Sequence, residues 1–252
     1  MPTCKRVNLP TCIKRPAIET LNAELLSCRK CPRLVAWREE MARVKRRAYH
    51  EREYWGKPVP GFGDPQARVV AVGLAPGAHG SNRTGRMFTG DASGEFLYAA
   101  LFRAGFANQP EASNRDDGLA LKDLYITAVC RCAPPGNKPL LQEMANCQPY
   151  LVRELELLRP QVIVALGRVA FDSILRIFQP LKTGSGSSAT FFHGALYPLK
   201  TSSPNTDPLN TEHWLLASYH PSRQNTQTGR LTAEMFDTVW QKVWELLDQP
   251  PR

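Results

Sequence analysis

Four short, nearly continuous apolar runs rich in β-branched residues alternate with longer helical patterns over most of this 252-residue chain. The candidate strands are residues 68–75, 124–129, 161–166 and 214–218. Runs of this kind are typical of parallel strands that are buried on both faces. The intervening patterns predict helices at about 92–104, 140–158, 168–178 and 231–247. The alternation of strand and helix predicts an α/β fold, in which an open, doubly wound sheet is covered by helices.

The N-terminal part of the chain has a different texture. Residues 1–16 contain three Pro and two Cys with little periodicity, which predicts a flexible tail. Residues 17–250 are expected to form a single domain that begins with a basic helical segment at 17–58. Within 29–52, nine Lys and Arg stand against three Glu, in a chain whose formal net charge is +9. This concentration indicates either a solvated helix face or a surface for an anionic partner such as nucleic acid.

The sequence lacks features that are typical of membrane and secreted proteins. No apolar run approaches the ~18 residues of a membrane span, and the first residues have no apolar secretory segment. Seven Cys, an odd number, do not suggest a disulfide framework. We therefore expect a soluble, intracellular (cytoplasmic) protein that makes no contact with membranes and acts as a monomer.

Four cysteines have spacings that suit a metal site. Cys28 and Cys31 form a C-x2-C pair in a basic, polar setting, and Cys132 and Cys147 are separated by 14 residues. Four thiolates suit a structural zinc or an iron–sulfur cluster, and the spacing does not separate the two. The alternative is a set of buried free thiols. Cys130 alternates to the other side of an extended segment from Cys132, and is expected to lie in the core.

The ends of the first and last candidate strands carry the other signals. In a doubly wound sheet the ligand site lies at the carboxyl ends of the strands. Eight of the 17 Gly lie between residues 61 and 94, but no dinucleotide or Walker pattern is present, which disfavours a nucleotide hydrolase. The alternative to a ligand-binding role for this glycine-rich segment is a structural turn. At the end of the last strand, the neutral imidazole of His220 can donate a hydrogen bond to a developing anion, or it is a satisfied structural histidine.

These segments together resemble a known family. The motifs are GLAPGAHGSNRTGRMFTGDASG at 73–94, YITAVCRCAPPGNKP at 125–139, HGA at 193–195 and YHPSRQNTQTGRLT at 219–232. They are similar to the iron–sulfur uracil-DNA glycosylases of family 5, or type B, over residues 21–247. The resemblance implies a three-layer α/β/α fold with a four-stranded parallel central sheet and a base pocket at the strand ends. It also implies a [4Fe–4S] cluster, held by Cys28, Cys31, Cys132 and Cys147.

The implied activity is that of a DNA repair glycosylase. Such an enzyme flips a deaminated base out of DNA and hydrolyses its N-glycosidic bond without a covalent intermediate, leaving an abasic site. Other branches of the superfamily carry Asp, Asn or Glu where this chain has Leu74 or Ala75. The small Ala75 predicts room for hypoxanthine and xanthine as well as uracil. Because the usual water-positioning group is absent, the alternative is a metal-stabilised module that recognises lesions in DNA without turnover.

The resemblance also assigns roles to single residues. His220 is expected to donate to a carbonyl oxygen of the departing base, and Phe88 to stack on that base. Asn137 is expected to read a base edge, unless it is only a turn residue. Asp91 is a candidate to orient water or stabilise the sugar cation, and equally a helix N-cap. The other candidates for the base pocket are Gly73, Ala75, His79 and His193.

Contacts with DNA are expected on both sides of this pocket. Arg223 and Gln224 follow His220 and are expected to enter the space that the flipped base leaves. Candidate phosphate contacts are Arg83, Lys45, Arg46 and Arg47. If several of them act, affinity for DNA falls steeply with salt.

Overall fold

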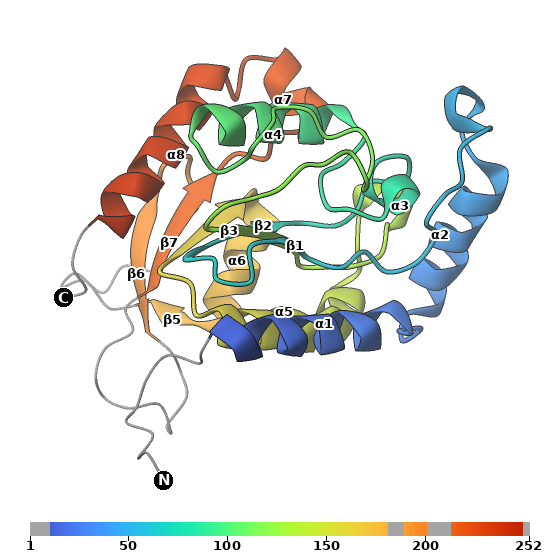
Figure 1. Cartoon of the computed structure of the whole chain (residues 1–252), viewed down its shortest axis with the longest axis horizontal. Helices are drawn as coiled ribbons and strands as arrows, with labels where there is room; N and C mark the ends of the chain where they lie inside the picture. Colours follow the sequence, from blue (N-terminus) through green and yellow to red (C-terminus); the bar gives the residue numbers. More distant parts are fainter. Residues whose placement is uncertain (1–10, 181–188, 201–212, 249–252) are drawn as a thin grey trace, which may run out of the picture.

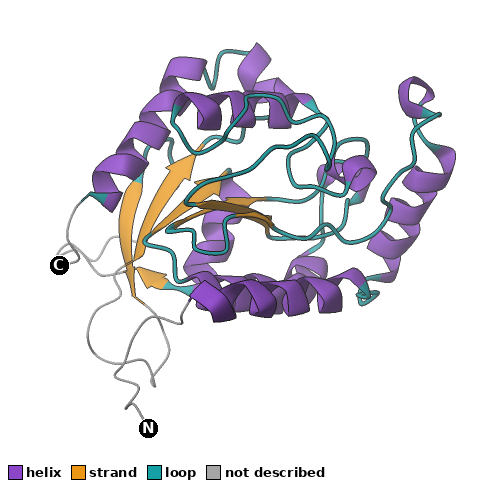
Figure 2. Cartoon of the chain, in the orientation of Figure 1, coloured by secondary structure: helices purple, strands orange, loops and turns teal. Residues whose placement is uncertain are grey.

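The computed structural model describes residues 11–180, 189–200 and 213–248, which form a mixed sheet between layers of helices (Figures 1 and 2). The sheet has seven strands in the order β1-β3-β2-β4-β7-β6-β5. The strands are β1 (Phe62–Gly63), β2 (Val69–Gly73), β3 (Leu124–Ala128), β4 (Val162–Leu166), β5 (Gln179–Pro180), β6 (Leu196–Lys200) and β7 (His213–Ser218). The α-helices are α1 (Thr11–Leu26), α2 (Pro32–Val44), α3 (Ser81–Thr84), α4 (Ala92–Arg103), α5 (Leu141–Leu158), α6 (Arg168–Ile177), α7 (Arg223–Gln227) and α8 (Ala233–Leu247). Two short 3-10 turns are η1 (Arg47–Tyr49) and η2 (Pro135–Asn137).

The four strands expected from the sequence form the parallel centre of the sheet, in the order β3-β2-β4-β7. The sheet is larger than expected, because β1, β6 and β5 extend it through antiparallel pairing at its two edges. Two-residue strands such as β1 and β5 are too short to show a period. β6 contains Pro198, which has no N–H group for the ladder and weakens any strand pattern.

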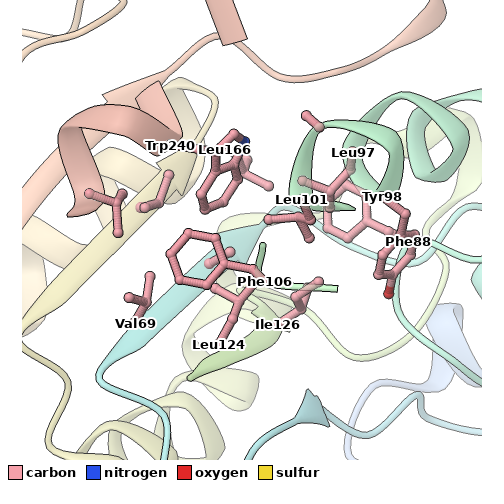
Figure 3. Close-up of a cluster of buried hydrophobic side chains, with 14 of the residues drawn as sticks. Val69, Phe88, Leu97, Tyr98, Leu101, Phe106, Leu124, Ile126, Leu166 and Trp240 are labelled. Carbon is pink, nitrogen blue, oxygen red and sulfur yellow. The ribbon is translucent and has the colours of Figure 1, made fainter. Parts of the chain in front are cut away.

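The central strands are buried on both faces because helices cover each side. Val69 and Ala71 of β2 pack in one cluster with residues of α4 and α8. Val70 and Val72 point to the opposite face and pack with residues of α5 and α6. Figure 3 shows the first cluster, with Trp240 of α8 close to the strands. The α/β class and the three-layer arrangement are therefore confirmed.

The N-terminal segment forms two helices. α1 begins at Thr11, so residues 11–16 are helical where a tail was expected, and residues 1–10 lie outside the described part. Buried Leu21 and Leu25 lie one turn apart on α1, which packs along α5 (Figure 1). The chain leaves the helix after Leu26 and re-enters it at Pro32, whose fixed φ suits a first helical position. The Cys28–Cys31 pair lies in this interruption. Within the described ranges, no helix has the length and apolar character that a membrane crossing needs.

Candidate active site and cysteine hollow

A cavity of about 400 Å³ lies where the loops after β2, β3 and β7 meet, at the carboxyl ends of the parallel strands. It brings together seven residues that the sequence singles out: Leu74, Ala75, Phe88, Asp91, Asn137, His220 and Gln224. Sequence reasoning missed other residues of the lining, including Met87, Ser93 and Ser222. All three lie inside the quoted motifs, so the signal for them was their place in those segments.

His220 lies two residues beyond the end of β7. Its backbone carbonyl accepts a hydrogen bond of 2.9 Å from the side-chain amide of Asn225. Gly167 leaves space for it, since a Cβ there would be 3.3 Å from the His220 Cβ. Burial lowers the pKa of His220 to about 4, so the ring is neutral at pH 7. Because no described residue hydrogen-bonds to the ring, its N–H is free for a ligand.

Phe88 forms a wall of the cavity beside His220. The two ring centroids are 5.8 Å apart, with 31° between the planes. Phe88 has a φ of 50°, in the left-handed region that non-glycine residues seldom adopt. The preceding carbonyl of Met87 accepts a hydrogen bond from the hydroxyl of Tyr98, beside which Phe88 lies in Figure 3. Gly73 does not line the cavity; it lies under the ring, and a Cβ there would be 2.8 Å from Phe88.

The two carboxylate oxygens of Asp91 have different surroundings. Its Oδ1 accepts hydrogen bonds of 3.1 Å from the N–H groups of Ser93 and Gly94, which makes Asp91 the N-cap of α4. Its Oδ2 lies against Gly80 and accepts no hydrogen bond from the described residues. Burial raises the pKa of Asp91 above its usual range. The expected N-cap is therefore present, and the second oxygen remains available for chemistry.

Asn137 lies on the rim of the cavity, at the end of η2. Its backbone is left-handed, with a φ of 57°, and its exposed side-chain amide has no partner among the described residues. Arg33 of α2 holds the next residue in place, by donating to the carbonyl of Lys138 at 3.1 Å. The same guanidinium binds the carboxylate of Glu143 in α5. No pattern in the sequence indicates this contact, which spans more than 100 residues.

His79 and His193 were expected in the base pocket, and the structure places neither in the cavity lining. The Nδ1 of His193 accepts a hydrogen bond of 3.2 Å from the N–H of Tyr219, and the two rings stack. His193 therefore anchors the end of β7 from outside. His79 Nδ1 lies 3.1 Å from the hydroxyl of Tyr54, on the other side of the glycine-rich loop.

The residues expected to contact DNA form two groups. Arg223 and Gln224 are exposed at the start of α7, and Gln224 reaches the cavity. Arg46 and Arg47 are exposed, Lys45 is half-buried, and all three follow the end of α2.

Arg83 braces the glycine-rich loop from within. It donates to the carbonyls of His79 and Gly90, both at 2.8 Å, and packs over the ring of Tyr49. Tyr54 links this loop to the basic segment, because its hydroxyl also accepts from the N–H of Arg46 at 3.3 Å. An aromatic residue beside a basic run was the available signal for Tyr54.

The four cysteines singled out by spacing line one small hollow, which we call the cysteine hollow. They come from the interruption between α1 and α2, the loop after β3, and α5. Arg38 Nη1 donates to Cys132 Sγ at 2.9 Å, and the Asn146 amide to Cys31 Sγ at 3.5 Å. Within the described ranges, no group of three or more His, Cys, Asp or Glu side chains is arranged to hold a metal ion.

The thiols around this hollow differ in their surroundings. Burial raises the pKa of Cys132 to about 12, although the guanidinium of Arg38 opposes the shift. A hydrogen bond from Cys130 lowers the pKa of Cys147 below its usual range. Cys130 itself is fully buried in the core cluster on the α5 side of the sheet, as its position in the sequence predicts.

Comparison with known proteins places this geometry in a family. The Uracil DNA glycosylase superfamily model matches residues 60–244. A type-5 uracil-DNA glycosylase from Thermus thermophilus is 54% identical over 84% of this chain and 90% of its own length. One from Mycobacterium leprae is 48% identical over 91% of this chain and 96% of its own length. A type-4 uracil-DNA glycosylase from Archaeoglobus fulgidus is 34% identical over 64% of this chain and 65% of its own length. The chain therefore belongs to the uracil-DNA glycosylase superfamily of N-glycosyl hydrolases, and within it to the type-5 enzymes.

Proposed function

We propose that this protein excises uracil from DNA by hydrolysing the N-glycosidic bond, and that it also accepts hypoxanthine and xanthine. The observation that carries this proposal is the cavity of about 400 Å³ that joins Phe88, Asn137 and His220 at the strand ends. Its volume lies in the range of about 300–1,000 Å³ that is common for small-molecule sites. Small Ala75 in the lining supports room for a purine as well as a pyrimidine.

The residues of the cavity suggest how the base is held and released. A base flipped out of the duplex stacks on Phe88, and the exposed amide of Asn137 hydrogen-bonds to its edge. His220 donates a hydrogen bond to a carbonyl oxygen of the base as negative charge develops on it. A neutral imidazole suits this role, since it stabilises the departing anion without transferring a proton.

Water completes the reaction beside Asp91. As the C1′–N bond breaks, the sugar gains positive charge, which the Oδ2 of Asp91 stabilises. The water oxygen then bonds to C1′, and the departing base anion takes up the proton that this water releases. No covalent bond to the protein forms, so the product is an abasic site in DNA.

The chemistry of the cysteine hollow fits a [4Fe–4S] cluster held by Cys28, Cys31, Cys132 and Cys147. Donors from Arg38, Asn146 and the backbone N–H of Arg131 point at three of the sulfurs, as suits thiolate ligands. A bound cluster supplies a cross-link between α2, the loop after β3 and α5.

The second candidate function is recognition of lesions in DNA without turnover. Leu74 and Ala75 favour it, because both are apolar and line the cavity where other branches carry a polar group. Both functions require the same pocket and the same partner, DNA with a deaminated base.

Single-turnover assays on duplexes that carry uracil, hypoxanthine or xanthine separate the two. We expect release of all three bases by the metal-loaded protein. The variant His220→Ala should release uracil at least ~100-fold more slowly, as expected when a transition-state donor is lost. Its affinity for duplexes with an abasic site should be unchanged, which serves as the control for folding. Tight binding without release by the wild type would favour the recognition module, and release of uracil alone would remove the purines from the proposal.

A further inference from the structure

Arg38 is a buried cation without a close carboxylate partner. It lies on α2 and is 2% exposed. Its Nη1 donates to Cys132 Sγ at 2.9 Å and its Nη2 to the carbonyl of Cys28 at 3.3 Å. Its Nε is buried and has no partner among the described residues. A guanidinium removed from water in this way is strongly destabilising unless negative charge lies next to it.

The nearest carboxylate does not supply that charge. The Oε1 of Glu39 lies 3.9 Å from Arg38 Nη2, on a half-exposed side chain. The same carboxylate already accepts two hydrogen bonds from Arg29, at 2.6 and 3.1 Å. Glu39 is therefore shared with another cation and screened by solvent, so the main counter-charge of Arg38 has to come from the cysteine side.

A second buried arginine, Arg131, is in the lining of the cysteine hollow. Arg131 is fully buried between Cys130 and Cys132, and forms an ion pair with Glu154. That pair neutralises its charge, but its Nε and Nη1 remain without partners among the described residues. Arg38, which donates to Cys132, and Arg131, which precedes Cys132, thus have buried N–H donors without partners among the described residues, and Arg38 adds a positive charge that no close carboxylate offsets. These surroundings suit a bound group with a net negative charge.

We propose that Arg38 offsets the negative charge of the four cysteine thiolates and the metal centre they hold, and that its hydrogen bond to Cys132 raises the reduction potential of that centre. The inference rests on the [4Fe–4S] cluster proposed above. Reduction adds negative charge to the centre, and a nearby cation with an N–H···S bond stabilises the more negative state. Arg38 is therefore a positioning residue, which acts through Cys132 and takes no part in base release.

The test is a redox titration of the purified, iron-loaded protein, together with the rate of iron release to a chelator. Arg38→Met should move the midpoint potential to a more negative value, and speed iron release about tenfold, as expected for the loss of a charge-assisted hydrogen bond. Arg38→Lys keeps the charge and should restore part of both effects. The matched control is Arg43→Met on the same helix, whose side chain is 74% exposed and pairs with Glu40, and it should leave both readouts at wild-type values.

The outcomes distinguish this inference from the proposals on which it rests. Loaded Arg38→Met protein with the potential and iron-release rate of the wild type would overturn the role of Arg38 and leave the cluster intact. If Arg38→Met does not retain iron, the lysine variant decides. A midpoint potential equal to that of the wild type would then overturn the role of the hydrogen bond to Cys132. Wild-type protein that releases uracil but binds no iron would overturn the cluster and this inference together, without touching the glycosylase proposal.

Discussion

Glycines determine where the two rings of the candidate active site lie. Gly73 ends β2 directly under Phe88, where a Cβ would approach the ring to 2.8 Å. Gly167 follows β4 and leaves space for the Cβ of His220. Both glycines therefore act at the site without touching a ligand. A side chain at Gly73 would displace the ring that we expect to stack on the base.

The half-buried imidazole of His220 makes stability depend on pH. Its pKa is about 4 in the folded protein and about 6.5 in an unfolded chain, so between these values the unfolded state binds more protons. The free energy of unfolding should therefore fall as pH drops from 6.5 to 4, by up to about 3 kcal/mol from this residue. Urea denaturation of the wild type and His220→Gln across this window measures it, and the wild type should lose more. Parallel curves for the two proteins would refute the assignment.

The sequence predicts part of the site for an identifiable reason. Residues such as Phe88, Asp91 and His220 follow strand ends, and the topology of a parallel sheet brings such positions together. His79 and His193 lie in equally distinctive motifs but outside the cavity. Their hydrogen bonds to Tyr54 and Tyr219 hold them outside the cavity. Contacts of this kind join residues far apart in the chain and are not predictable from the sequence.

At the scale of elements, the N-terminus of α4 carries the sharpest test, because Asp91 both caps it and faces the cavity. Asp91→Ala should lower the free energy of unfolding by about 1 kcal/mol and slow base release. Asp91→Ser keeps a capping oxygen but removes the carboxylate, so it should slow base release with little loss of stability. Thermal or urea unfolding and single-turnover kinetics on both variants measure this. If the serine variant releases the base at the wild-type rate, Asp91 acts only as the N-cap of α4.

The segment after α2 is tested by salt. If Arg46 and Arg47 bind phosphates, replacing both by Ala should reduce the slope of log K against log salt by about 0.9 for each phosphate that is no longer neutralised, or about 1.8 for two. The rate of base release at saturating enzyme should stay unchanged. Titration of a labelled duplex at several salt concentrations gives the slope. Arg168→Ala, an exposed position on α6, is the control, and an equal change in that variant would remove the assignment.

The elements themselves were predictable where packing is simple. The four central strands are buried on both faces, so their apolar runs identify them. The antiparallel strand β6 and the break between α1 and α2 were missed, because one depends on pairing with β7 and the other on how the cysteines are placed. Tertiary contacts decide both, and local pattern does not record them.

At the scale of the whole molecule, the cysteine hollow joins the N-terminal helices to the α/β body. If the proposed cluster is bound there, Cys132→Ser should lose it and loosen α2, while α4 and α8 on the far face stay protected. Hydrogen exchange read by mass spectrometry, with iron content measured in parallel, follows both effects. Cys130→Ser is the matched control, since it changes another buried thiol but keeps a donor to Cys147, and it should leave iron content unchanged. Unaltered exchange in α2 of an iron-free variant would show that the helices hold without the centre.

The ribosome makes the two halves of the cysteine hollow at different times. Cys28 and Cys31 leave the ribosome more than 100 residues before Cys147, and α1 packs on α5, which ends at Leu158. At about 5–20 residues per second, the N-terminal helices wait roughly 5–25 s for the partners that fix them. During that interval the basic segment and the thiols of Cys28 and Cys31 emerge before the rest of the fold exists. Newly made protein is therefore exposed to oxidation and to capture by polyanions during its own synthesis, before it can engage any lesion.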